Sequence, residues 1–277
     1  MIQVNNLSFG YKKNKLLYRN LTIDLAAGSI YGLLGKNGAG KSTFFKNLIG
    51  LLFPVDGSIS INGFIPRQRL PAFLENIYLI PEEVHVPSLT IERYKTLFSP
   101  FYPHFNEADF FAYLQQLDVK ETGKLNTLSF GQQKKFIIAF ALACNTKILL
   151  LDEPTNGLDI PSKIRFRKLI SSILTEDKLI FISTHQIRDL DNLIDRVVIV
   201  DNGDLLLNAS ISEVSEKLCF KTVTDIDDEN KVLYKEESLK GITIVCENTG
   251  NENSKVNLEH LFNAVTENPE RAKSFFK

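Results

Sequence analysis

The chain of 277 residues has little that would place it within a membrane or on a nucleic acid. Its longest apolar run, residues 136–144, is about half as long as a membrane-spanning helix requires, and no charged-then-apolar signal segment is present. The 32 lysines and arginines nearly balance the 33 aspartates and glutamates, so the net charge of -1 offers no bulk attraction to nucleic acid or anionic lipid. We therefore expect no nucleic-acid partner.

Cysteine is also scarce. The only three are Cys144, Cys219 and Cys246, which are too scattered for the C-x-x-C spacing of a zinc site or a redox pair. Unpaired thiols of this kind are typical of the reducing cytosol. We expect a soluble cytoplasmic protein in which any role at a membrane depends on a partner.

A glycine-rich run at residues 35–42 fits the pattern G-x-x-x-x-G-K-[ST]. Its glycines let backbone N–H groups turn around phosphate oxygens, Lys41 reaches the β- and γ-phosphates, and the Ser42 hydroxyl can bind Mg²⁺. An apolar strand over residues 29–34 and a helix over 41–51 flank the run, and the helix N-terminus favours an anion. The predicted nucleotide contacts of this loop are Gly35, Lys36, Asn37, Gly38, Ala39, Gly40, Lys41, Ser42 and Thr43.

Apolar periodicity predicts an alternation of strands and helices along the rest of the chain. The predicted strands lie within residues 2–25 and at 57–61, 77–80, 147–151 and 179–183, with a hairpin at 196–207 around a central Asn-Gly pair. The predicted helices cover 106–117, a segment beginning at 129, 161–174 and 186–194. This β/α repetition predicts a doubly wound sheet.

Two adjacent carboxylates follow the apolar strand at 147–151, at the edge where ligands of open α/β sheets bind. Asp152 can hold Mg²⁺ through its water shell, and Glu153 can polarise an attacking water molecule. A phosphate loop followed by this pair is the arrangement expected of an enzyme that hydrolyses a nucleoside triphosphate.

Three further motifs complete an ordered set: Leu-Ser-Phe-Gly-Gln at 128–132, Gly-Leu-Asp at 157–159 and Ser-Thr-His at 183–185. With the phosphate loop and the acidic pair, the set resembles the nucleotide-binding subunits of ATP-binding cassette (ABC) transporters. The resemblance covers roughly residues 2–208. It implies ATP and Mg²⁺ as ligands, ATP hydrolysis coupled to transport, and Lys41, Glu153 and His185 as the catalytic residues.

The same resemblance implies the remaining site residues. Tyr11 would stack on adenine, Asp159 would line the interface between two ATPase subunits, and His185 would sense the γ-phosphate. The signature motif, which would cap the γ-phosphate of ATP bound to a second copy, comprises Ser129, Phe130, Gly131 and Gln132. A helix N-terminus that carries a hydroxyl and a glycine is suited to that task.

Two positions depart from the family pattern. Glu82 stands where the family usually has glutamine; a carboxylate there can still contact Mg²⁺ or its water, so the expected metal set is Ser42, Asp152 and Glu82. Phe130 replaces the commoner small residue of the signature, so its ring must point away from the nucleotide. The acidic pair after Pro81 is similar to a branch of ABC-2-type exporters whose ATPase is a separate polypeptide.

The expected fold is an α/β P-loop NTPase of ABC type with a mixed sheet, an N-terminal antiparallel β subdomain and a helical subdomain. The ATPase domain would span residues 1–210, with the helical subdomain at about 84–145. Residues 211–277 would form a small α+β extension, with an acidic stretch at 225–230, short strands at 232–234 and 242–246, and a helix starting near 257.

The leading functional hypothesis is an ATPase subunit that forms a head-to-tail dimer, either with itself or with a close paralogue. It would drive a separate membrane permease, held at the inner face of the cell membrane, and export is favoured over import. The stretch 82–105, rich in aromatics and prolines, is the candidate permease contact. The alternative is a soluble ABC-type ATPase that acts as an assembly factor.

Overall fold

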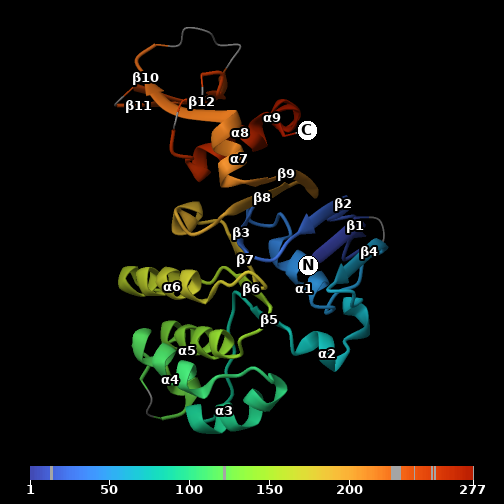
Figure 1. Ribbon diagram of the computed structural model, residues 1–277, viewed down its shortest axis with the longest axis vertical. Coiled ribbons are helices and arrows are strands. Elements are labelled where there is room, and N and C mark those ends of the chain that lie inside the picture. The colour runs from blue at the N-terminus through green and yellow to red at the C-terminus, as the bar shows by residue number, and fades with distance from the viewer. Residues whose placement is uncertain are drawn as a thin grey trace.

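The computed structural model describes residues 1–12, 15–120, 123–225, 232–239, 241–250, 252 and 254–276. A six-stranded sheet forms its centre, in the order β5-β6-β7-β3-β8-β9 (Figure 1). These strands are β5 (Ile77–Ile80), β6 (Ile148–Asp152), β7 (Leu179–Thr184), β3 (Ser29–Leu34), β8 (Arg196–Asp201) and β9 (Asp204–Ser210). The first five are parallel and β9 is antiparallel to β8, which confirms the predicted mixed sheet.

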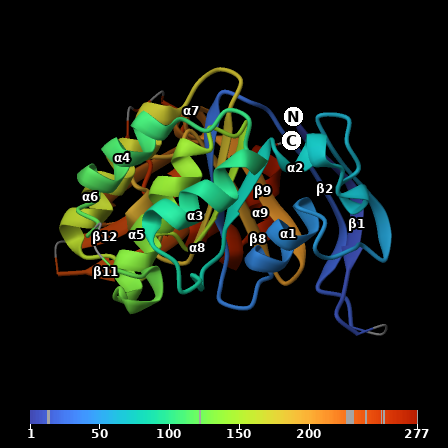
Figure 2. The same cartoon turned by 90° about the horizontal axis from the view of Figure 1, so that it is seen from below.

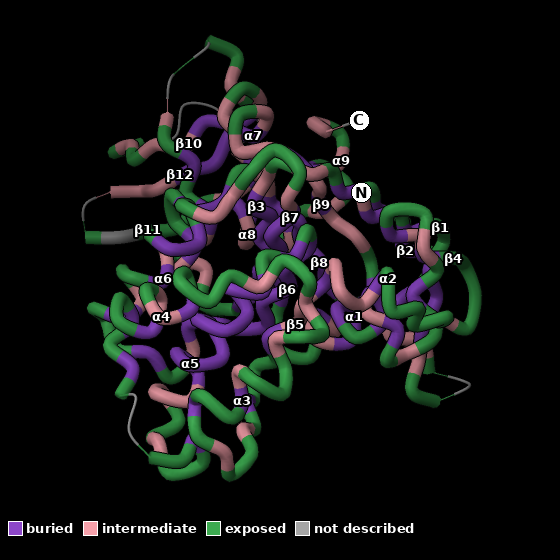
Figure 3. Tube along the Cα trace, turned by 60° about the horizontal axis from the view of Figure 1, so that its bottom comes forward, coloured by how far each residue is buried: buried purple, intermediate pink, exposed green. Residues whose placement is uncertain are grey.

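The central sheet is buried on both faces because successive strand residues contribute to two separate cores. In β6, Leu149 and Leu151 belong to one core and Leu150 to the other. The first core is shared with α4 (Glu107–Gln116), α5 (Phe130–Ala143) and α6 (Ile160–Ile173), and the second with α1 (Lys41–Leu48). Helices therefore cover both faces, as the doubly wound prediction required, and Figure 3 shows the strands largely in the buried colour.

An antiparallel sheet in the order β2-β1-β4 packs beside α1. Its strands are β1 (Ile2–Phe9), β2 (Tyr18–Leu25) and β4 (Asp56–Ile61), followed by η1 (Pro66–Gln68) and α2 (Pro71–Leu74). The helices α3 to α6 gather on the opposite side of the molecule when it is viewed from below (Figure 2). This arrangement is the predicted N-terminal antiparallel β subdomain.

Residues 91–143 form a helical layer of α3 (Ile91–Phe98), η2 (Ser99–Phe101), α4, η3 (Leu125–Thr127) and α5. Thr90, Asn106 and Ser129 cap the three α-helices through side-chain oxygens that accept backbone N–H groups. In the core between α4 and α5, the Phe110 ring of α4 packs against the rings of Phe136 and Phe140 of α5. No helix among the described residues is both long and apolar enough to cross a bilayer.

The C-terminal segment forms its own sheet in the order β10-β12-β11, at the end of the molecule opposite α3 (Figure 1). Its elements are α7 (Ile211–Lys217), β10 (Leu218–Val223), β11 (Val232–Ser238), β12 (Gly241–Glu247), α8 (Leu258–Glu267) and α9 (Pro269–Phe275). The two predicted strands and the helix capped by Asn257 are present. The predicted acidic stretch lies, beyond its first residue, outside the described residues, and α7, β10 and α9 were not predicted.

One predicted helix is wrong. Residues 186–194 contain only a short 3-10 turn, η4 (Ile187–Leu190), because Asn192 adopts a left-handed φ of 60° that ends helical geometry. The apolar spacing that suggested a helix instead buries Leu190 in the core, while Arg188 turns outward to pair with Glu259 of α8 at 2.9 Å. The predicted helix at 41–51 also ends early, because Gly50 has a φ of +68°.

Candidate functional site

The phosphate loop connects β3 to α1 and depends on one glycine in particular. Gly40 caps α1 with a φ of 100°, and a Cβ at this position would lie 2.3 Å from the Tyr18 hydroxyl. That hydroxyl donates a hydrogen bond to the Gly40 carbonyl. Only glycine combines this backbone conformation with this approach, so the loop is held open at the N-terminus of α1, where an anion is favoured.

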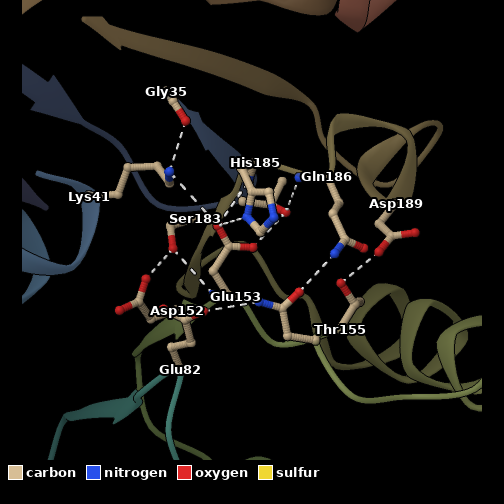
Figure 4. Close-up of polar contacts among 12 residues, drawn as sticks. Gly35, Lys41, Glu82, Asp152, Glu153, Thr155, Ser183, His185, Gln186 and Asp189 are labelled. Carbon is tan, nitrogen blue, oxygen red and sulfur yellow. Dashed lines mark hydrogen bonds and ion pairs between the residues drawn. The ribbon is translucent and has the colours of Figure 1, made fainter. Parts of the chain in front are cut away.

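Lys41, the first residue of α1, turns its side chain back over the loop. Its Nζ donates to the carbonyls of Gly35 at 2.8 Å and Lys36 at 3.3 Å, and lies 3.8 Å from Glu153 Oε1 (Figure 4). Burial lowers the pKa of the Lys41 ammonium, and the nearby carboxylates of Glu153, Asp152 and Glu82 oppose that shift. The ammonium therefore lies beside the loop, where phosphate oxygens could replace the Gly35 and Lys36 carbonyls as its hydrogen-bond acceptors.

A pocket of about 330 Å³ brings most of the predicted site residues together. Besides Leu17, it is lined by predicted residues from five separate segments: Tyr11, Asn37, Gly38, Gly40, Lys41, Ser42, Thr43, Glu82, Glu153 and His185. Gly35, Lys36 and Ala39 belong to the same loop but do not line this pocket. Lys36 is exposed, and its Nζ lies 3.8 Å from Asp201 Oδ2. Strand β7 lies between β3 and β6, so His185 sits between the phosphate loop and the acidic pair.

Glu153 is fixed by its backbone conformation and by several hydrogen bonds. It has a left-handed φ of 45°, a conformation that costs about 1–3 kcal/mol for a residue other than glycine. Its Oε2 accepts from the Thr184 hydroxyl at 3.0 Å, and its Oε1 accepts from the His185 backbone N–H and meets His185 Nδ1, both at 2.8 Å. The carboxylate is therefore aimed into the pocket and clamped to the end of β7.

Asp152 lies at the end of β6 and is buried, with only 5% of its surface exposed. Its Oδ1 accepts from the Ser183 hydroxyl of the adjacent strand (Figure 4). Ser42 lines the pocket from α1, whereas Asp152, next to Glu153, is not among the residues that line it. Hydroxyl and carboxylate oxygens are the ligands that Mg²⁺ prefers, so the donor chemistry of Ser42 and Asp152 fits that ion.

Glu82 follows β5 and also lines the pocket, but its carboxylate is already engaged. Its Oε1 accepts from Asn156 Nδ2 at 3.1 Å, and Asn156 Oδ1 accepts from Gln186 Nε2 at 3.0 Å. Lys163 extends the chain by donating to Gln186 Oε1 at 3.0 Å and to Asp189 at 2.7 Å. These bonds tie the residues that follow β5, β6 and β7 into one polar network.

Tyr11 stands at the mouth of the pocket. Its side chain is 66% exposed, its hydroxyl lies 2.9 Å from Thr43 Oγ1, and its ring meets Phe9 edge-on. An exposed aromatic face beside the phosphate loop is available for stacking by a flat apolar group such as a nucleobase.

The predicted signature residues lie outside this pocket. Ser129 caps α5 by accepting from the Gln132 N–H at 3.4 Å. The Gln132 side chain is directed into its own helical layer, where it accepts from Lys120 N at 3.2 Å and donates to Asp118 O at 3.0 Å. Asp159 caps α6 by accepting from Ser162 N and lies 3.9 Å from Lys135 Nζ.

Phe130 makes a contact that the sequence did not reveal. Its ring packs directly on Gly157, where an added Cβ would come within 2.7 Å of the ring, and Gly157 has a φ of +78°. A Cβ at Gly131 would approach the Gly157 carbonyl to 3.0 Å. The two glycines thus let the first turn of α5 pack closely against the loop before α6, with the ring half exposed.

Several residues of the site were missed at the sequence level. Ser183 and Thr184 orient the acidic pair, and Asn156 joins Glu82 to Gln186. Lys134, in α5, is fully buried and donates to the carbonyls of Glu82 and Glu153. Its one sequence signal is the pair Lys134-Lys135 before the apolar segment 136–144, a weak sign because long lysine side chains often reach solvent.

Comparison with known proteins agrees with this geometry. The sequence profile of the ABC transporter family matches residues 18–156. A putative ABC transporter ATP-binding protein of Listeria monocytogenes is 31% identical, over 77% of this chain and 84% of its own length. The Nod factor export ATP-binding protein I of Burkholderia lata is 28% identical, over 84% of this chain and 81% of its own.

Solved structures show the same architecture. An ATP-binding subunit of an ABC transporter superposes with a TM-score of 0.70 and 26% identity, covering 77% of this chain and 91% of its own. A dimeric bacterial ABC transporter cassette shares the fold with a TM-score of 0.67 at 23% identity, over 76% of this chain and 98% of its own. The phosphate loop, the acidic pair and the family match together identify the chain as an ATPase that belongs to the ATP-binding proteins of the ABC transporter family.

Proposed function

We propose that the chain is the cytoplasmic ATPase subunit of an exporter, in which two copies close head to tail around two ATP molecules and drive a separate membrane permease. The observation that carries this proposal is the division of the site within one chain. Lys41, Glu153 and His185 converge on one pocket, whereas Ser129 and Gly131 lie outside it. A helix N-terminus without a ligand in its own chain is suited to the phosphate of a second copy.

In the proposed reaction, ATP enters the pocket with adenine against Tyr11 and its phosphates at the start of α1. Lys41 exchanges the Gly35 carbonyl for phosphate oxygens and stabilises the charge that develops on the transferred group. The fixed carboxylate of Glu153 orients and polarises the attacking water. Because these groups are positioned before ATP arrives, little reorganisation is needed at the reaction step.

His185 has a defined part in this scheme. An ionised Glu153 only accepts hydrogen bonds, so the 2.8 Å contact places a proton on His185 Nδ1. The Nε2 atom of the same ring is then the one available for the γ-phosphate, and it can donate there only when the ring carries a second proton. His185 would thus link the phosphate to the general base.

Ser42, Asp152 and Glu82 would hold Mg²⁺, and Glu82 could do so while its Oε1 keeps the bond from Asn156, because a carboxylate offers two oxygens. When bound, the ion would neutralise part of the phosphate charge. The residues of the chain itself would keep the ion in place, because Ser183 fixes the orientation of Asp152.

Export and a permease partner are supported by similarity and by surface chemistry. A similar protein in Burkholderia lata is named for Nod factor export. Within the stretch 82–105, exposed apolar side chains gather on α3 and η2, at the end of the molecule opposite the C-terminal sheet; they are Leu97, Phe98 and Phe101. A permease that covers this surface would hold the subunit at the inner face of the membrane.

The test is size-exclusion chromatography with light scattering on Glu153→Gln, with and without ATP and Mg²⁺. We expect an ATP-dependent dimer, because a chain that binds but does not hydrolyse ATP stays closed, and we expect Ser129→Arg to abolish it in the same background. A protein that binds ATP yet stays monomeric at every concentration would contradict the head-to-tail proposal. Co-purification with a polytopic membrane protein tests the permease, and a stable complex with soluble proteins alone would contradict it.

A further inference from the structure

Lys134 is the one lysine among the described residues whose surface is entirely buried. It lies in α5, three residues beyond Gly131, and its side chain runs from the helical layer toward the ends of β5 and β6. Nζ donates to the Glu82 carbonyl at 2.7 Å and to the Glu153 carbonyl at 3.1 Å. A buried ammonium is costly unless it is hydrogen bonded, so these two contacts fix where the side chain ends.

The Glu153 backbone is held at both of its polar groups. Its N–H donates to the Ser183 carbonyl at 3.1 Å and approaches the Ser183 hydroxyl at 3.3 Å, and its carbonyl accepts from Lys134 Nζ at 3.1 Å and from the Asn156 N–H at 3.2 Å. Glu153 is also in the left-handed conformation, which a residue with a side chain adopts only when its surroundings impose it. Lys134 is the residue of α5 that helps to impose this conformation, through its hydrogen bond to the Glu153 carbonyl.

We infer that Lys134 is a positioning residue for ATP hydrolysis, which holds the Glu153 backbone so that the carboxylate stays aimed into the pocket and which couples it to α5. The inference rests on the proposed role of Glu153 as general base. The first turns of α5 make two more contacts with the segment 153–159, which begins at Glu153. The Phe130 ring packs on Gly157, and Lys135 Nζ lies 3.9 Å from Asp159 Oδ1. A shift of α5, which carries the signature motif at its start, would therefore be transmitted to Glu153.

The charge of Lys134 suits this position. Burial lowers the pKa of its ammonium, while the carboxylates of Glu82, Asp152 and Glu153 raise it. Nζ donates to the backbone carbonyl of Glu153, so this contact does not pull the Glu153 carboxylate out of the pocket.

The experiment compares Lys134→Met with Lys178→Met in the full chain. Methionine keeps the length and bulk of the side chain but cannot donate. Lys178 is a matched control, because it is partly buried and donates to Asn145 Oδ1 at 2.6 Å and the Ile173 carbonyl at 3.2 Å, far from the pocket. We expect Lys134→Met to lower kcat about 30- to 100-fold and to change KM for ATP less than about threefold. Lys178→Met should leave both within about twofold.

A double-mutant cycle separates positioning from general damage. If Lys134 acts through Glu153, then Lys134→Met should cost no further activity in a Glu153→Gln background, because that carboxylate is already lost. Lys134→Gln, whose amide can still donate to a carbonyl, should recover part of kcat. Should Lys134→Met not fold, Lys134→Gln carries the same comparison, with an expected loss of about three- to tenfold in kcat.

Two results would overturn the inference while leaving the proposed function intact. One is a kcat for Lys134→Met within about twofold of the wild type while Glu153→Gln is inactive. The other is a loss expressed mainly in KM, which would make Lys134 a residue for ATP binding. Full activity in Glu153→Gln alone would instead overturn the proposed role of Glu153, on which the inference depends.

Discussion

The pocket at the phosphate loop and the surface at the start of α5 hold their functional residues differently. In the pocket, Lys41 and His185 each contact the Glu153 carboxylate directly, so the three side chains are already oriented. By contrast, Ser129 caps α5 and Asp159 caps the neighbouring α6, and neither residue lines the pocket. Under the proposed function, one chain would bind ATP with its own pocket, whereas hydrolysis would also need a surface from a second copy.

The largest effect should come from the pocket. Lys41→Met removes the ammonium that can contact the β- and γ-phosphates, so we expect ATPase activity to fall about 1000-fold and ATP affinity about tenfold or more. Isothermal titration and a phosphate-release assay measure the two quantities. Lys36→Met is the control in the same loop, with an expected change of about twofold because that side chain is exposed. Equal losses in both variants would show that Lys41 has no special place in the site.

The second largest effect should come from the start of α5, and it distinguishes this surface from the pocket at the phosphate loop. Ser129→Arg should reduce ATPase activity about 10- to 100-fold while a single chain binds ATP within about twofold of the wild type, because Ser129 lies outside the pocket. Ser129→Asp supplies the control, since aspartate preserves the helix cap but repels a phosphate. A loss of ATP affinity in either variant would contradict the division of the site.

A third change tests the contact that connects the signature with the loop before α6. Gly157→Ala should lower the free energy of unfolding by about 1–3 kcal/mol, because its φ of +78° disfavours a side chain and its Cβ would strike the Phe130 ring. Urea denaturation measures the change. In the double variant Phe130→Ala with Gly157→Ala, the clash with the ring is gone, so that part of the lost stability should be recovered. The part caused by the left-handed backbone of residue 157 should remain. Strictly additive losses would show that the ring does not press on Gly157.

The smallest effect concerns Gln132. Its side chain is bonded to Lys120 N and Asp118 O within the helical layer, so Gln132→Ala should cost about 1 kcal/mol of stability and change kcat less than about threefold. Thermal unfolding and steady-state kinetics measure the two quantities. A loss of activity as large as that of Ser129→Arg would instead assign Gln132 to the partner's ATP.

Much of the fold could be predicted because local patterns and tertiary structure agree. The strands at 29–34 and 77–80 have the predicted bounds, and helices begin at Asn106, Ser129 and Asn257, where the sequence predicts their starts. The segment after His185 could not be predicted, because packing against α8 and the left-handed Asn192 override a helical spacing. Short elements such as α7, of seven residues, offer too little periodicity to be recognised.

The sequence by itself determined the identity and order of the chemical groups: the phosphate loop, the acidic pair, the signature and the histidine. Each of these motifs consists of residues close together in the chain, so their spacing in the sequence is enough to define a loop or a helix cap. Only the tertiary structure decided that β7 lies between β3 and β6, that Glu82 is held by Asn156, and that Lys134 reaches the Glu153 carbonyl. Such contacts join residues far apart in sequence, and their geometry arises when the sheet and the helical layer pack together.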